Sequence, residues 1–145
     1  GSPDHAMQHL AFAAQPKLLW QSSIGAGAES ERPLLPSPVV AEGRVYTVDS
    51  RNEVRAFDVA SGNRVWDRDL TDHEDDDDAM SGGIAYDSGR LFVTTGFAKV
   101  FALDARTGKV IWRRTVESPI HAPPVVADGR VFIITVENNQ SIALR

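Results

Sequence analysis

The densest group of potential cation ligands in the sequence is the acidic run DHEDDDD at residues 72–78. Ca²⁺ takes about six to eight oxygen ligands, which carboxylates can supply. An EF-hand loop, however, spaces its carboxylates and contains a glycine turn, whereas consecutive aspartates repel one another and stay hydrated. We therefore expect residues 72–78 to form a disordered, hydrated loop, with a Ca²⁺ site as the alternative.

Two other groupings also fall short of a reactive site. The glycines within residues 25–30 suggest a phosphate cradle, but Pro33 and Pro36 interrupt any helix that would follow them. Zero cysteines exclude a thiolate nucleophile and Cys-based metal sites. The four histidines do not form a ligand set by their spacing: His5, His9, His73 and His121. We predict no catalytic residue, no cofactor and no metal ligand, and we predict that the chain is not an enzyme.

Length and charge narrow the class further. The 145 residues carry 15 Lys and Arg against 20 Asp and Glu, with a net charge of −5 and 42% hydrophobic residues. This balance is typical of one globular domain or part of one, and it argues against a nucleic-acid partner. Gly1-Ser2 is typical of what a protease leaves after tag removal, so residues 1–15 are expected to be a disordered tag or leader.

An internal repeat organises the remaining residues, 16–145. The three tryptophans, Trp20, Trp66 and Trp112, follow one another at equal intervals of 46 residues. Residues 56–66 and 102–112 align without gaps on the pattern A-x-D-x-x-S/T-G-x-x-x-W. Equal spacing of all three tryptophans, together with a shared pattern, indicates repeated structural units.

Each repeat contains short β-branched and aromatic runs separated by turn residues, and no sustained helical period. Residues 38–46 and 124–132 match closely, so a third copy begins near Pro124. The blade units are expected at about 38–70, 83–116 and 124–145. The predicted strands are 38–41, 44–49, 53–58 and 64–69, then 83–86, 90–95, 98–104 and 109–115, then 124–127, 130–136 and 140–144, with an extra strand at 17–21. Units of this size with four strands predict an all-β fold, a β-propeller fragment of about three blades.

The repeated residues have structural roles in this interpretation. Asp58 and Asp104 can accept backbone N–H bonds in an Asx-turn, while Gly62 and Gly108 take the left-handed conformation. The tryptophans are expected to fill the space between neighbouring blades. Alanines share one position in the third strand of each unit, as expected where only a methyl group fits: Ala56, Ala102 and Ala143.

The repeat pattern resembles that of the quinoprotein, or PQQ-like, β-propellers. Within that superfamily, the residues around Trp20, 38–40, 81–86 and 122–126 look like the N-terminal part of the BamB family. That resemblance implies an eight-bladed, non-enzymatic scaffold of outer-membrane β-barrel assembly. It also implies a lipid anchor, a place on the periplasmic face of the outer membrane, and BamA-like POTRA domains as the protein partner.

Two alternatives remain open at this stage. A PQQ-dependent quinoprotein dehydrogenase shares the repeat, although such enzymes usually also carry a vicinal Cys-Cys pair. A generic PQQ-like protein-binding propeller is the other alternative. For the repeated aspartates Asp58 and Asp104, a turn role is favoured over a catalytic one.

The strand count also bears on assembly. A closed propeller leaves no sheet edge exposed. The predicted strand at 17–21 has no preceding strands of its own, and the last predicted strand, 140–144, has no following one. We therefore expect a possible homo-oligomer in which these two segments pair between chains by strand exchange.

Overall fold

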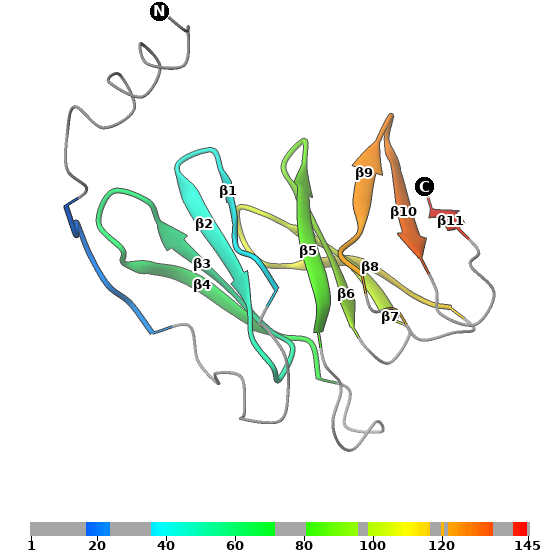
Figure 1. Ribbon diagram of the computed structural model, residues 1–145, viewed down its shortest axis with the longest axis horizontal. Coiled ribbons are helices and arrows are strands. Elements are labelled where there is room, and N and C mark those ends of the chain that lie inside the picture. The colour runs from blue at the N-terminus through cyan, green and yellow to red at the C-terminus, as the bar shows by residue number, and fades with distance from the viewer. Residues whose placement is uncertain are drawn as a thin grey trace, which may run out of the picture.

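The computed structural model describes residues 17–23, 36–71, 81–95, 99–116, 120, 122–134 and 141–144, and every structural statement below refers to them. Within these ranges the chain is all-β, with eleven strands and no helix (Figure 1). The described part of the chain holds no helical segment long and apolar enough to span a bilayer. The predicted leader, the segment 25–30, the acidic run and the four histidines lie outside the described residues.

The strands form three antiparallel sheets that follow one another in chain order (Figure 1). The first sheet contains β1 (Val39–Ala41), β2 (Arg44–Val48), β3 (Glu53–Asp58) and β4 (Arg64–Asp69). The second contains β5 (Ser81–Asp87), β6 (Arg90–Thr95), β7 (Lys99–Asp104) and β8 (Val110–Thr115). The third contains β9 (Val125–Ala127), β10 (Arg130–Ile134) and β11 (Ser141–Leu144). These strands lie within one residue or a few of the predicted ones, and the all-β propeller fold class is confirmed.

Residues 17–23 differ from the prediction, because they form no strand in the structure. A strand is defined by backbone pairing with a neighbour, and no described strand lies beside this segment to supply one. The residue types at 17–21 are therefore typical of a strand, but within the described residues this segment has no strand to pair with.

Tight turns explain how the first two strands of each sheet reverse. Two-residue type I′ turns require positive φ at both central residues. That requirement is met by Glu42 and Gly43, with φ of 48° and 75°, and equally in the other two sheets. Glycine occupies the second position each time, since it adopts this conformation without steric cost.

The sheets stack through two apolar faces. One hydrophobic cluster joins Tyr46, Val48 and Val54 of the first sheet to Leu91 and Phe101 of the second. A second cluster joins the opposite face of the second sheet to the third: Phe92, Val100, Ala102, Ile120, Val131 and Ile133. Because side chains alternate along a strand, the second sheet contributes to both interfaces. The core of this molecule therefore lies between blades.

Candidate functional site: the contacts and grooves between blades

The hairpin between the third and fourth strands carries a repeated set of polar contacts in the first and second sheets. Oδ1 of Asp58 accepts hydrogen bonds from the backbone N–H groups of Ala60 and Ser61, each at 2.9 Å. The Gly62 N–H donates to the Asp58 carbonyl at 2.8 Å, with φ of 75° at Gly62. The N–H groups of Ser61 and Ala60 lower the pKa of the exposed Asp58 carboxyl below its ordinary value of 3.8.

The second blade repeats this geometry. Oδ1 of Asp104 accepts from the N–H groups of Arg106 at 2.8 Å and Thr107 at 3.3 Å. Gly108 donates to the Asp104 carbonyl at 2.8 Å and has φ of 76°. Both repeated aspartates therefore occupy their carboxylates with the local backbone, as an Asx-turn does.

Each hairpin is also the docking point for a tryptophan from the preceding unit. The Trp66 indole N–H donates to the Ala105 carbonyl at 3.0 Å, and the Trp20 indole N–H donates to the Val59 carbonyl at 2.7 Å. A Cβ added to Gly108 would lie 2.5 Å from the Trp66 ring, and one added to Gly62 would lie 2.5 Å from Trp20. The glycines thus let an indole ring lie directly on the backbone.

Two arginines strengthen the contact between the first and second blades. Arg44 Nη1 donates to the carbonyls of Ala105 at 3.3 Å and Arg106 at 2.9 Å. Arg68 Nε donates to the Gly108 carbonyl at 2.7 Å. Hydrogen bonds from charged donors contribute about 1.5–3 kcal/mol each, more than neutral ones. We call the three donors Arg44, Trp66 and Arg68 the inter-blade clasp.

Neither arginine of the clasp was predicted from the sequence. A signal for them was present, since Arg44 recurs as Arg90 and Arg130 after each first turn. Arg68 likewise recurs as Arg114, two residues after the tryptophan. Repetition marked these positions, but only the packing of one blade on the next shows what they bind.

A buried ion pair in the first blade was also missed. Arg55 Nη1 lies 3.1 Å from Asp49 Oδ2, and Arg55 Nη2 lies 2.9 Å from Glu53 Oε2. Asp49 Oδ1 accepts the backbone N–H groups of Arg51 and Glu53. The equivalent positions of the second blade, 46 residues further on, do not repeat these side-chain types, so periodicity alone does not reveal the cluster. Its hydrogen bonds hold the turn between β2 and β3.

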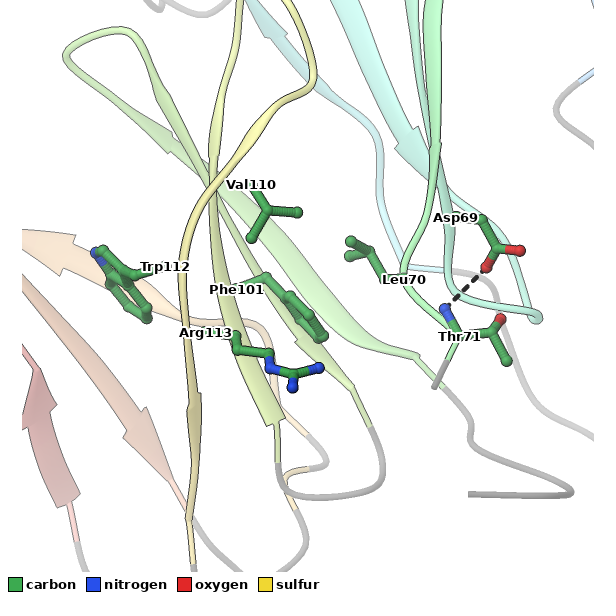
Figure 2. Close-up of a pocket in the computed structure, with 7 residues that line it drawn as sticks. All are labelled: Asp69, Leu70, Thr71, Phe101, Val110, Trp112 and Arg113. Atoms are coloured by element: carbon green, nitrogen blue, oxygen red, sulfur yellow. Dashed lines mark hydrogen bonds between the residues drawn. The ribbon is translucent and has the colours of Figure 1, made fainter. Parts of the chain in front are cut away.

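A groove lies between the end of β4 and the second sheet (Figure 2). Its volume is about 470 Å³, and its lining is Asp69, Leu70, Thr71, Phe101, Val110, Trp112 and Arg113. Phe101 and Arg113 point toward Leu70, whereas the Trp112 ring points to the other side of β8 (Figure 2). Leu70 and Phe101 are buried. The groove has an apolar floor with a guanidinium beside it, which suits an apolar side chain of a protein partner.

A smaller cavity of about 240 Å³ lies at the opposite end of the same interface, beside Arg44, Tyr46 and Tyr86. The two tyrosine rings stack with centroids 6.1 Å apart. Burial raises the pKa of Tyr46, and the charge of Arg44 opposes that rise. The Tyr46 phenol therefore stays protonated at neutral pH, and the two rings act as packing groups.

Trp112 has a different environment from the other tryptophans. Its ring lies 6.1 Å from that of Phe92, and the Arg114 guanidinium lies 5.5 Å from the Trp112 centroid. No described hairpin receives its indole N–H. All three tryptophan rings are partly exposed rather than buried. The described residues contain no group of three or more His, Cys, Asp or Glu side chains placed to hold a metal ion.

These features define the class of protein, a β-propeller built of repeated antiparallel sheets. Its hydrophobic clusters and the hydrogen bonds of the clasp lie between neighbouring blades. The model of the family described as "Outer membrane protein assembly factor BamB" matches residues 9–77 and 50–145. The chain belongs to this family.

The relatives include both assembly factors and dehydrogenases. The outer membrane protein assembly factor BamB of Moranella endobia is 30% identical over 129 residues, covering 83% of this chain and 33% of its own length. The 1-butanol dehydrogenase (cytochrome c) of Thauera butanivorans is 32% identical over 127 residues, covering 80% of this chain and 18% of its own length. The chain spans between 26% and 33% of the length of the first curated relatives that it matches.

Among solved structures, BamB from Moraxella catarrhalis has a TM-score of 0.55 and 20% identity. That match covers 68% of this chain and 29% of the other. At this identity the likeness concerns the fold, and it is consistent with the propeller architecture described above.

The clasp predicts a measurable role for the Trp66 ring. We expect Trp66→Ala to lower the free energy of unfolding by about 2–4 kcal/mol, because it removes a partly buried ring and its hydrogen bond. Trp66→Phe keeps part of the ring packing and should cost about 1 kcal/mol. Urea denaturation measures the free energy of unfolding of both variants. A decrease below about 1 kcal/mol for Trp66→Ala would show that the ring does not stabilise the fold.

Alanine substitutions can distinguish the effect of the contact between Gly108 and Trp66 on stability from the effect of backbone strain. Gly108 and Gly89 both have positive φ, 76° and 81°, but nothing lies within 4 Å of a Cβ added to Gly89. Strain costs about 1–2 kcal/mol in both alanine variants. We expect Gly108→Ala to destabilise the protein by at least about 1 kcal/mol more than Gly89→Ala. Equal urea midpoints would show that the indole does not press on this backbone.

The lowered pKa of Asp58 predicts a pH dependence. A carboxylate whose pKa is depressed by folding contributes stability above its ordinary pKa, and that stability is lost as pH falls through the lower value. We expect Asp58→Asn to flatten the fall of the thermal midpoint between about pH 4 and about pH 2. Asp67→Asn, an exposed change on β4, is the control. An unchanged slope in Asp58→Asn would contradict the role of the Asx-turn.

Proposed function

We propose that this chain forms part of a non-enzymatic scaffold in outer-membrane β-barrel protein assembly, on the periplasmic face of the outer membrane. The observation that carries the proposal is the family match, which extends over residues 9–145 and thus over all three sheets. The partner that this assignment implies is the POTRA region of a BamA-like barrel, and the lipid anchor implied by the resemblance would provide the membrane attachment.

The geometry of the blades supports a scaffold. The acidic residues that the repeat shares, Asp58 and Asp104, accept hydrogen bonds from their own hairpins. The clasp residues bind backbone carbonyls of the next blade. Polar groups repeated along the chain are therefore engaged in holding blades together, and the groove beside Phe101 offers a surface for a protein side chain.

A PQQ-dependent dehydrogenase is the second candidate. It is favoured by the 32% identity to 1-butanol dehydrogenase, of which the chain matches 18%. The shared segment is the blade repeat, which both kinds of propeller contain. The two candidates differ in what loss of the gene should do to the cell, and this gives a direct test.

We expect deletion of the gene to reduce the amount of folded β-barrel protein in the outer membrane. Heat-modifiable migration of an abundant barrel protein on semi-native gels measures this amount, and complementation with the intact gene is the control. Cross-linking of the gene product to the POTRA region of BamA should succeed without added quinone. Normal barrel assembly together with a loss of PQQ-dependent alcohol oxidation would overturn the scaffold and establish the enzyme.

A further inference from the structure

The smaller cavity between the first two blades is lined by charged and phenolic side chains from both of them. Its volume is about 240 Å³, and we call it the tyrosine cavity. Glu42, Arg44 and Tyr46 line it from the first blade. Tyr86 and Arg106 line it from the second blade. A molecule bound in this cavity would therefore contact both blades at once.

The two phenols offer hydrogen-bond donors to the cavity. A tyrosine hydroxyl has one O–H donor and also accepts hydrogen bonds through its oxygen. The Gly89 N–H donates to Tyr86 Oη at 3.1 Å. The Arg44 guanidinium likewise hydrogen-bonds the Tyr46 phenol oxygen, and burial raises the pKa of Tyr46. Because the described residues give each oxygen a bond that it accepts, each O–H is left to donate.

Two guanidinium groups add further donors and positive charge. Arg44 uses Nη1 for the carbonyls of Ala105 and Arg106. A guanidinium carries more N–H groups than these contacts use. The Arg106 side chain is exposed, so it lies at the opening of the cavity. Among the described lining residues only Glu42 carries a carboxylate, so donors outnumber acceptors.

The charge and the size of the cavity narrow the class of ligand. The two guanidinium groups and the Glu42 carboxylate leave a single net positive charge, which a singly charged anion balances. A phosphate dianion would instead be repelled by Glu42 without full compensation. The volume of about 240 Å³ is below the roughly 300–1,000 Å³ typical of pockets for drug-sized ligands. The space therefore suits one small anionic group.

We propose that the tyrosine cavity binds a carboxylate, which accepts hydrogen bonds from both phenols and pairs with the two guanidinium groups. Carboxylates are strong acceptors for donors of both kinds. The carboxylate belongs to a small organic acid or to an acidic side chain of a polypeptide, because both present the same group to the cavity. Binding would join the first blade to the second. The inference is independent of the proposed function.

Thermal unfolding of the 145-residue chain in sodium acetate tests whether the site exists. A ligand that binds only the folded state raises the thermal midpoint as its concentration increases. We expect acetate to raise the midpoint above the value measured in sodium chloride of equal ionic strength. Isothermal titration then gives the dissociation constant for acetate. A midpoint that is the same in the two salts would overturn the proposal.

Variants of the lining test whether these side chains bind the anion. We expect Tyr86→Phe, which keeps the ring, to raise the dissociation constant for acetate about tenfold, as for a lost hydrogen bond to a charged group. Arg106→Gln should raise it by a similar factor and keeps the backbone N–H that binds Asp104. Arg51→Gln removes an equal, exposed charge in the turn between β2 and β3 and should leave the constant unchanged. Equal effects of the two arginine variants, or no effect of Tyr86→Phe, would overturn the site.

Glu42 gives a test of anion selectivity that does not remove a donor. Glu42→Gln keeps the size of the side chain at a backbone φ of 48°. Loss of its negative charge should raise the affinity for inorganic phosphate at least about tenfold, and by a larger factor than the affinity for acetate. Equal factors for the two anions would overturn the selectivity for a singly charged carboxylate.

Peptide probes distinguish the two sources of the carboxylate. A tripeptide with blocked ends and a central glutamate carries one carboxylate, and the same peptide with glutamine is the control. Tighter binding of the glutamate peptide than of acetate would assign the cavity to an acidic side chain of a polypeptide. Binding of acetate without binding of this peptide would assign it to a small organic acid. Equal binding of the two peptides would overturn the role of the carboxylate.

Discussion

The interaction on which this structure depends is the docking of a tryptophan from one blade onto the backbone of the next. The Trp66 indole rests on Gly108 and donates to the Ala105 carbonyl, while Arg44 donates to the same carbonyl. A flat ring and a bare glycine backbone bring the hairpin close, and directional hydrogen bonds fix its angle. The orientation of the first sheet relative to the second follows from this contact.

The apolar core also lies between neighbouring blades. Each sheet has two faces, and the second sheet buries Leu91 and Phe101 on one side and Phe92 and Val100 on the other. A single blade could not bury both faces, so stability arises between neighbours, as in other repeat architectures.

The stacking of blades through their faces also explains why proteins of different function share this repeat. Assembly factors and dehydrogenases can share the repeat, because the repeat solves the problem of stacking blades and leaves the chemistry to surfaces and loops. In the described residues, Asp58 and Asp104 are used by their own hairpins. The groove beside Phe101 lies between the end of β4 and the second sheet, so it too is formed where two blades meet.

The sequence by itself determined the strands, the turns and the repeat, because these depend on local properties: residue alternation, glycine at positive φ and the aspartate that accepts its own backbone N–H groups. Tertiary structure decided the partners. The sequence placed Trp66 between blades but could not show that the ring stays partly exposed, or that Arg44 and Arg68 share its hairpin. Residues 17–23 carried the pattern of a strand, yet a strand exists only where a neighbour offers backbone groups. Contacts between units depend on the angle at which one sheet meets the next, and that angle is set by packing rather than by any single segment.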